Sequence, residues 1–236
     1  MSLLFRNNIK LLVCDMAGTI INEKGIIYKA IGSTLNKLGY PTTDDDSKTW
    51  HGKDKREVMY KHISSWCYGT LNKKHITHRV NKAEKLLLSE LEHKYFEDNS
   101  IELIDEELLE FFSKLRADGI KIALNTGYPK DFQEKIIKHL DLTNYVDTWI
   151  SSEDVLYGRP APYMIHHLME QCEILSVNNV AKVGDTVNDM KEGINAGCKL
   201  NIGVLSGADS IKDLAEYTDV ILDKITDLDN RDIHVY

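Results

Sequence analysis

Residues Ile9–Thr19 read I-K-L-L-V-C-D-M-A-G-T, an apolar run that ends in an aspartate. A short continuous apolar run is typical of a strand that is buried on both faces. Asp15 stands at its end, followed two residues later by Ala17 and then by Gly18-Thr19. The stretch therefore predicts a carboxylate at the end of a buried strand, with a methyl group where a second carboxylate could be expected.

Length and composition limit what the protein can be. The chain has 236 residues, enough for one ordinary domain and a smaller one. Its 42% hydrophobic and 28% charged residues are typical of a globular protein. A net charge of -8 argues against nucleic acid or an anionic membrane surface as the main partner. An anionic small substrate would need locally placed cations.

The cysteines and the N-terminal stretch bear on location. The four cysteines are scattered and have no C-x-x-C spacing, which favours reduced thiols in a cytoplasmic protein. The N-terminal apolar stretch is broken by Arg6 and Lys10 and lacks a small-residue cleavage site, so we expect no signal peptide. No run approaches the roughly 18 apolar residues of a membrane span.

Short apolar runs alternate with longer helical patterns over most of the chain. The predicted strands are Ile9–Cys14, Lys121–Asn125, Val146–Ile150, Val180–Val183, Lys199–Val204 and Asp219–Leu222. The predicted helices between them are Glu106–Arg116, Lys130–His139, Tyr163–Cys172 and Val187–Ala196. This rhythm predicts an α/β fold with a doubly wound, Rossmann-like parallel sheet, in which ligands bind at the carboxyl ends of the strands.

Between Ile26 and Phe96 the pattern becomes helical, without a convincing strand. The predicted helices are Ile26–Leu38, Lys55–Trp66 and Ile76–Phe96, and Asp44-Asp45-Asp46 is a loop or the start of a helix. We interpret this stretch as a helical cap inserted after the first strand. The predicted domains are a core of residues 1–22 and 98–236 and a cap of residues 23–97.

Four segments carry reactive groups to the predicted strand ends. They contain Asp15, Thr126-Gly127 in L-N-T-G-Y-P, Arg159 in Y-G-R-P-A-P, and Asp185 with Asp189 in V-G-D-T-V-N-D. Three carboxylates in one crevice repel one another unless a cation offsets them, and hard oxygen ligands favour Mg²⁺. A phosphoryl-like group would then be bound by the metal, the Thr126 hydroxyl, turn amides and Arg159, leaving one carboxylate free to attack.

Several of these residues also have a purely structural interpretation. Asp189 could cap the helix Val187–Ala196 as readily as it could touch the outer shell of a metal. Thr126 could be only a turn residue, and Tyr128 could line the pocket or only pack. An aspartate at a strand end can cap a turn, but the other three motifs favour a functional Asp15.

Taken together and in order, these motifs make the sequence resemble the haloacid-dehalogenase superfamily, whose members use an aspartate nucleophile and form an aspartyl-phosphate. Phosphatases of that superfamily resemble D-x-D-x-T, and their second aspartate protonates the leaving oxygen; here that position is Ala17. The alanine, Arg159, T-G-Y and the motif from Gly184 to Gly197 resemble the phosphonatase-like subgroup, that is, the phosphonoacetaldehyde hydrolase family. That family cleaves a carbon–phosphorus bond.

The resemblance implies a set of roles. Asp15 would be the nucleophile, and Asp15, Asp185, Asp189 and the backbone carbonyl of Ala17 would bind Mg²⁺. Thr126, Gly127, Tyr128 and Arg159 would bind the substrate. A carbanion leaves only if its electrons have a sink, which a lysine imine provides.

In the phosphonatases that lysine follows a glycine by three positions at the start of a cap helix, which places it at Lys55 after Gly52 in W-H-G-K-D-K-R-E-V. The helix N-terminus and Arg56 would lower its pKa. The family has a histidine three positions later, where this sequence has Val58; His51 is a possible substitute. A lysine on a solvated helix face is the alternative.

Three functions remain open at this point. The first is phosphonatase-like hydrolysis through a lysine imine, and the second is hydrolysis of a small phosphomonoester. The third is phosphate binding by a regulatory protein with little turnover. In each case the expected partner is a small anionic phosphonate or phosphate, and a homodimer is one expected assembly.

Overall fold

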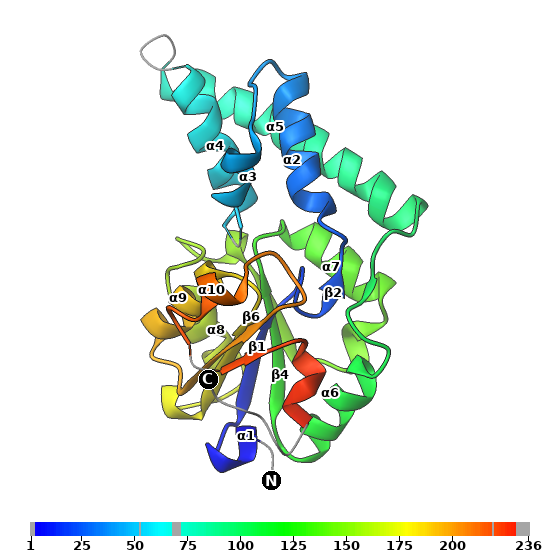
Figure 1. Ribbon diagram of the computed structural model, residues 1–236, viewed down its shortest axis with the longest axis vertical. Coiled ribbons are helices and arrows are strands. Elements are labelled where there is room, and N and C mark those ends of the chain that lie inside the picture. The colour runs from blue at the N-terminus through cyan, green and yellow to red at the C-terminus, as the bar shows by residue number, and fades with distance from the viewer. Residues whose placement is uncertain (1–2, 52, 68–71, 219, 230–236) are drawn as a thin grey trace.

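The computed structural model describes residues 3–51, 53–67, 72–218 and 220–229 and contains a six-stranded parallel sheet (Figure 1). The strand order is β5-β4-β1-β6-β7-β8. The strands are β1 (Leu11–Asp15), β4 (Lys121–Thr126), β5 (Thr148–Ser151), β6 (Val180–Gly184), β7 (Leu200–Val204) and β8 (Val220–Leu222). This order, with β1 in the middle, confirms the predicted doubly wound α/β fold.

The predicted strands occur at the expected places, with shifted ends. β1 begins at Leu11 instead of Ile9 and includes Asp15, and β4 continues to Thr126. β8 begins at Val220, and the predicted start, Asp219, lies outside the described residues. Every residue of β1 and β6 is buried, as a continuous apolar run requires.

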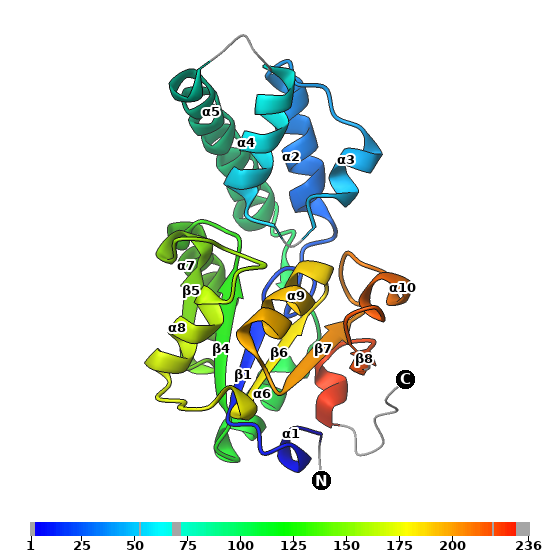
Figure 2. The same cartoon turned by 90° about the vertical axis from the view of Figure 1, so that its left-hand side faces the viewer.

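Helices pack against both faces of the sheet (Figure 2). On one face Leu11 and Val13 pack with Met164 and Leu168 of α8. On the other face Leu12 and Cys14 lie in the cluster that contains Leu108 and Phe112 of α6. The alternation of β1 side chains between the two faces follows from the period of two in a strand. The helices of this part are α1 (Leu3–Arg6), α6 (Leu108–Ala117), α7 (Lys130–His139), α8 (Tyr163–Gln171), α9 (Val187–Ala196) and α10 (Ile211–Leu214).

A second group of helices lies beyond the carboxyl ends of the strands (Figures 1 and 2). It consists of α2 (Ile26–Lys37), α3 (Asp44–Lys48), α4 (Lys55–Trp66), α5 (Lys73–Glu92) and the π-helical turn η1 (His93–Glu97). Their apolar faces pack on one another through residues such as Ile31, Ile63, Val80 and Leu87. The arrangement is that expected of an inserted cap, and we keep residues 23–97 as its proposed extent.

In this helical group the structure selects one of two predicted alternatives for the three aspartates, and it moves the start of one predicted helix. The three aspartates form the first turn of α3, because Thr43 caps that helix in a capping box with Asp46. The predicted helix Ile76–Phe96 begins earlier, at Lys73, where Asn72 caps it, and its last turn is π-helical. Within the described residues, none of the helices is both long and apolar enough to cross a membrane.

The chain crosses between the two parts through a short antiparallel ribbon that the sequence did not predict. The ribbon consists of β2 (Ile21–Asn22) and β3 (Glu102–Leu103). Two-residue strands are too short to show a period in the sequence. The remaining short elements are 3-10 turns, namely η2 (Leu142–Asn144), η3 (Ser152–Asp154), η4 (Val177–Asn179) and η5 (Ile225–Asp229).

Candidate active site

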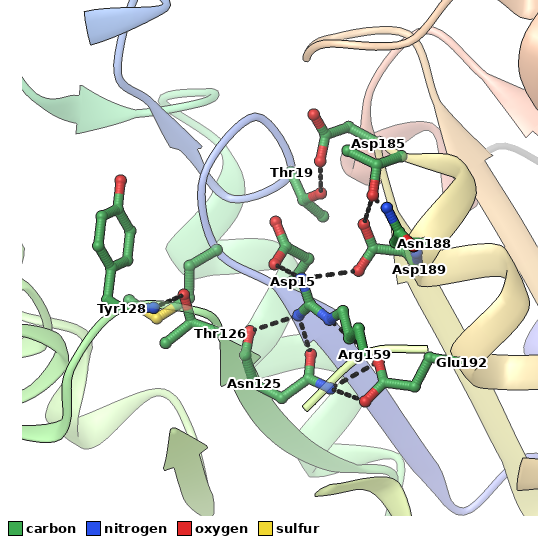
Figure 3. Close-up of polar contacts among 12 residues, drawn as sticks. Asp15, Thr19, Asn125, Thr126, Tyr128, Arg159, Asp185, Asn188, Asp189 and Glu192 are labelled. Carbon is green, nitrogen blue, oxygen red and sulfur yellow. Dashed lines mark hydrogen bonds and ion pairs between the residues drawn. The ribbon is translucent and has the colours of Figure 1, made fainter. Parts of the chain in front are cut away.

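The carboxyl ends of neighbouring strands bring the predicted site residues together (Figure 3). In the register of the sheet, Asp15 pairs with Asn125 of β4, and Cys14 pairs with Val183 of β6. Asp185 follows β6 directly and so lies beside Asp15. Segments that are far apart in the sequence therefore meet at β1, in the centre of the sheet.

Asp15, Asp185 and Asp189 form one buried cluster, in which carboxylate oxygens lie within 4.8 Å of one another. Burial raises the pKa of Asp15, although the Arg159 guanidinium opposes the shift. Burial raises the pKa of Asp185 well above its usual range, and the charges of Asp15 and Asp189 add to the effect. Without a further cation, the site therefore favours a proton on Asp185 at pH values where a carboxyl is normally ionised.

Arg159 contacts two members of this cluster and two further residues. Its Nη1 lies 2.6 Å from Oδ1 of Asp15 and 3.1 Å from Oδ1 of Asp189. Its Nε lies 3.1 Å from Oε2 of Glu192, and its Nη2 donates to the carbonyl of Asn125 at 2.9 Å. The guanidinium thus touches the predicted nucleophile. Its binding of the transferring group stays a prediction.

A network beneath Arg159 was missed by the sequence prediction. The Nζ atom of Lys182, on β6, lies 2.9 Å from Oδ1 of Asp189 and donates to Oδ1 of Asn125 at 2.9 Å. Glu192 accepts two hydrogen bonds from Nδ2 of Asn125, at 3.0 and 2.9 Å. A lysine inside the apolar run V-A-K-V was the available signal, because a buried charge is costly unless it is paired.

The charges of this buried cluster leave room for a divalent cation. Among the described residues, Arg159 and Lys182 form the ion pairs inside this cluster, with Asp15, Asp189 and Glu192, and Asp185 is its fourth carboxylate. Asp185 has no cationic partner in the described part of the chain; it accepts from the Ala208 amide at 2.7 Å and from Thr19 Oγ1 at 3.4 Å. The oxygen-only donor set and the missing positive charge both fit Mg²⁺. Asp15, Asp185 and the carbonyl of Ala17 would hold it, and Ala17 lines the same cavity as Asp185.

Asp189 is not the cap of α9. The residue that caps this helix is Thr186, whose Oγ1 accepts from the Asp189 amide at 3.3 Å. Burial alone would raise the pKa of Asp189, but Arg159 and Lys182 outweigh it, and the pKa is lowered. Both carboxylate oxygens are engaged, one by these cations and the other by the Thr186 hydroxyl. Direct coordination of a metal by Asp189 stays a prediction.

Two glycines allow the backbone to lie against the Asp185 carboxylate. Gly18 follows Ala17 with a positive φ of 82°, and Gly207 lies in the loop after β7. A methyl group built at either position would overlap the Asp185 side chain. The close approach of both backbones therefore requires residues without a Cβ.

Gly207→Ala is expected to displace Asp185 and to weaken Mg²⁺ binding at least about tenfold, the size of effect seen when support of a metal ligand is lost. Calorimetric titration with Mg²⁺ measures this. Gly32→Ala is the matched control, since its methyl group would meet only Thr42 Oγ1, at an ordinary 3.4 Å. Equal Mg²⁺ affinity in the parent and in Gly207→Ala would contradict the metal site.

Lys55 begins α4 on the side of the helical group that faces the acidic cluster. Its Nζ donates to the carbonyl of Lys53 at 3.2 Å and lies 5.5 Å from the ring centre of Tyr28 and 5.8 Å from that of Tyr128. Lys55 and Tyr128 also line one cavity, whose other walls include Leu87 and Leu91. This setting does not fit a lysine on a solvated helix face.

The electrostatic surroundings of Lys55 differ in part from the prediction. Burial lowers the pKa of Lys55, Asp15 opposes the shift, and Arg159 adds to it. Arg56, which was predicted to lower this pKa, instead forms an ion pair with Glu84 of α5. Arg56 is not among the groups with the largest effects on this pKa, and its predicted influence stays a prediction.

The loop before α4 packs directly on the turn after β4. A methyl group at Gly127 would lie 3.1 Å from the carbonyl of Lys53, so glycine permits this contact. Thr126 is buried, and its Oγ1 accepts from the Tyr128 amide at 3.2 Å. Figure 3 shows Tyr128 on the far side of Thr126 from the acidic cluster. The substrate-binding roles of these three residues stay predictions.

The position of the missing histidine and its possible substitute, His51, lie in different surroundings. Val58 is buried inside the helical group. Nδ1 of His51 lies 2.7 Å from Oδ1 of Asp209, and its carbonyl accepts from Nδ2 of Asn188 at 2.6 Å. His51 therefore joins the helical group to the loops around Asp185. Gly52 lies outside the described residues.

Comparison with known proteins agrees with this geometry. The model of the family described as haloacid dehalogenase-like hydrolase matches residues 9–197. The chain is 40% identical over 105 residues to a phosphonoacetaldehyde hydrolase of Parabacteroides distasonis, a match that covers 44% of this chain and only 39% of that protein. It is 32% identical to one of Latilactobacillus sakei over 85% of this chain and 77% of that protein. A crystal structure of a phosphonoacetaldehyde hydrolase-like protein from Oleispira antarctica has a TM-score of 0.76 at 21% identity, over 94% of this chain and 90% of that one.

Proposed function

We propose that this chain, which belongs to the haloacid dehalogenase-like hydrolase family, cleaves the carbon–phosphorus bond of a phosphonoacetaldehyde-like substrate with the help of Mg²⁺. It is a hydrolase of that family. The observation that carries the substrate class is the electrostatic interaction of the Lys55 amine with the Asp15 carboxylate, together with Ala17 in place of an acid. The named relatives support the same chemistry.

The mechanism starts with Lys55. Its lowered pKa leaves a larger fraction of neutral amine at neutral pH than an exposed lysine has. The amine attacks the aldehyde carbon, water leaves, and an iminium forms. The iminium carbon is next to the carbon that bears phosphorus, so it can accept the electron pair of the breaking bond.

Asp15 then attacks phosphorus. An oxygen–phosphorus bond forms as the carbon–phosphorus bond breaks, and the released pair moves to the iminium nitrogen to give an enamine. Because the leaving atom is carbon and its charge is taken up by nitrogen, no acid at position 17 is needed, and Ala17 suffices. When bound, Mg²⁺ would supply positive charge against the phosphorus-bound oxygens. Water then hydrolyses the aspartyl-phosphate to phosphate and regenerates Asp15, and hydrolysis of the imine formed from the protonated enamine frees Lys55.

Treatment with phosphonoacetaldehyde and borohydride is expected to leave a mass adduct on Lys55, because borohydride reduces the imine to a stable secondary amine. The adduct is an N-ethyl group if the carbon–phosphorus bond has already broken and an N-phosphonoethyl group if it has not. Peptide mass spectrometry locates it. Lys55→Arg keeps the positive charge but should give no adduct, and the matched Lys53→Arg should give the parent's yield.

Two other results would replace the proposal. If the parent forms no adduct and Lys55→Arg hydrolyses phosphomonoesters as fast as the parent, the function is that of a phosphatase. If no phosphonate or phosphomonoester in a panel releases phosphate with Mg²⁺, the protein is a phosphate-binding regulator.

The same proposal extends to partners and location. The proposed partner is a small anionic phosphonate, which would enter between the helical group and the sheet. The proposed assembly is a homodimer, and the proposed location is the cytoplasm. Support for the location comes from Cys14, Cys172 and Cys198, which are free thiols.

A further inference from the structure

A chain of three buried side chains joins the Lys55 cavity to the crossover segments. Oη of Tyr128 lies 2.8 Å from Oη of Tyr95, and Tyr95 Oη donates to Oε2 of Glu23 at 3.3 Å. Glu23 also accepts from the Ile27 amide at 2.8 Å. The exposed fractions of Tyr128, Tyr95 and Glu23 are 2%, 0% and 7%, so bulk water has little access to the chain.

Each member comes from a different segment. Glu23 lies between β2 and α2, Tyr95 lies in the π-helical turn η1, and Tyr128 follows β4. Single π-helical turns are rare and occur frequently at functional sites. Neither Glu23 nor Tyr95 belongs to a motif that stood out in the sequence.

The carboxylate fixes the direction of the hydrogen bonds. An ionised carboxylate only accepts, so Tyr95 must give its single hydroxyl proton to Glu23. Tyr128 must then give its own proton to Tyr95. The remaining lone pairs of Tyr128 Oη can only accept a proton from elsewhere.

Lys55 lies against the ring of Tyr128 at this end of the chain. Its Nζ lies 5.8 Å from the ring centre of Tyr128, and the two residues line one cavity. The charged groups that act on Lys55 are Asp15, Arg159, Asp54 and Glu23. Glu23 thus already affects the lysine electrostatically through the same buried region.

We propose that Tyr128, Tyr95 and Glu23 form the proton relay that serves imine formation at Lys55. The relay would replace a histidine at the position that Val58 occupies here. The proposal rests on the function proposed above. Tyr128 accepts the proton of the Lys55 ammonium and passes its own to Tyr95, which passes its own to Glu23. Tyr128 shares a cavity with Lys55, while Tyr95 and Glu23 act through it and are positioning residues.

The step balances without a further reactant. The Lys55 ammonium becomes an amine as the Glu23 carboxylate becomes a carboxylic acid, and both tyrosines regain a hydroxyl proton. After the amine has bonded to the aldehyde carbon, the proton returns along the chain to the carbinolamine hydroxyl. That hydroxyl leaves as water, and the nitrogen lone pair forms the iminium.

The test measures the rate of borohydride-trapped adduct at saturating phosphonoacetaldehyde over a range of pH. Tyr95→Phe and Glu23→Gln are expected to slow trapping about a hundredfold at neutral pH, at the low end of the usual effect of general acid–base groups. The deficit should vary with pH, because solvent takes over the removal of the Lys55 proton as the pH rises, whereas the return of a proton to the carbinolamine hydroxyl still needs the relay. Tyr40→Phe is the matched control, since Tyr40 is a buried tyrosine of the helical group whose hydroxyl accepts from Arg79; it should trap at the parent's rate.

The possible outcomes separate the relay from the proposed function. Adduct that forms at the parent's rate in both variants would overturn the relay and leave the imine in place. A deficit that stays constant with pH would also overturn it, since a merely structural defect does not depend on the protonation of Lys55. Absence of adduct in the parent at every pH would overturn the proposed function and the relay with it. Thermal unfolding identifies a variant that fails to fold, and the other variant then decides.

Discussion

Asp15→Asn is expected to lower kcat for phosphate release by about 10⁴-fold or more, the scale of loss when a nucleophile is removed. The asparagine amide has nearly the same shape as the carboxylate but is a far weaker nucleophile, so neither the phosphonatase nor the phosphatase mechanism can proceed. The measurement is phosphate release from phosphonoacetaldehyde and from a panel of phosphomonoesters, with Mg²⁺ present.

The control for Asp15→Asn is the same change at a carboxylate outside the crevice. Asp105 pairs with Lys224 and accepts from Thr226 at 2.7 Å, and Asp105→Asn should keep the parent's kcat. The adduct on Lys55 should still form in Asp15→Asn, because imine formation precedes the attack on phosphorus, and it should carry the phosphonoethyl group. More than a tenth of the parent's kcat in Asp15→Asn would rule out Asp15 as the nucleophile.

The sheet and the acidic cluster were predictable because their signals are local. A buried parallel strand reads as a mostly apolar run, and an aspartate marks the carboxyl ends of two such runs, at Asp15 and Asp185. Parallel strands place those ends at one edge of the sheet. Motifs that follow different strands could therefore be expected to meet at this edge.

The supporting groups could not be predicted, because their partners lie far away in the sequence. The hydrogen bond between Lys182 and Asn125 spans 57 residues, and that between Tyr95 and Glu23 spans 72. The helical period predicts that Tyr95 points inward with Leu87 and Leu91, which its burial confirms, but it does not indicate that the hydroxyl meets Glu23. Arg56 is a related case, since it follows Lys55 in the sequence but forms its ion pair with Glu84 of α5, a distant partner that the sequence did not indicate.

The buried network also links Arg159 to the stability of the fold. Arg159 holds Asp15, Asp189 and Glu192 with a side chain that is only 3% exposed. Removing one partner of a buried ion pair leaves an uncompensated charge, which is far more damaging than removing both. The stability of the fold is therefore expected to depend on the same guanidinium that is predicted to bind the transferring group.

Arg159→Met is expected to lower the free energy of unfolding by about 3–5 kcal/mol, measured by urea denaturation at neutral pH. Methionine keeps much of the side-chain volume but removes the charge. Arg116→Met is the matched control. Arg116 pairs with Asp147 at 3.3 Å but is 35% exposed, so we expect a loss of no more than about 1 kcal/mol.

The loss in Arg159→Met should grow as the pH rises. Burial already raises the pKa of Asp15, and removing the guanidinium that opposes this shift raises it further. A carboxyl whose folded pKa exceeds its unfolded value keeps its proton in the folded protein where the unfolded chain releases it. Stability is therefore greatest below the unfolded pKa of about 4 and falls as the pH rises toward the folded pKa. A loss below about 1 kcal/mol at neutral pH, or one that does not change between pH 5 and pH 8, would show that Arg159 does not compensate these carboxylates.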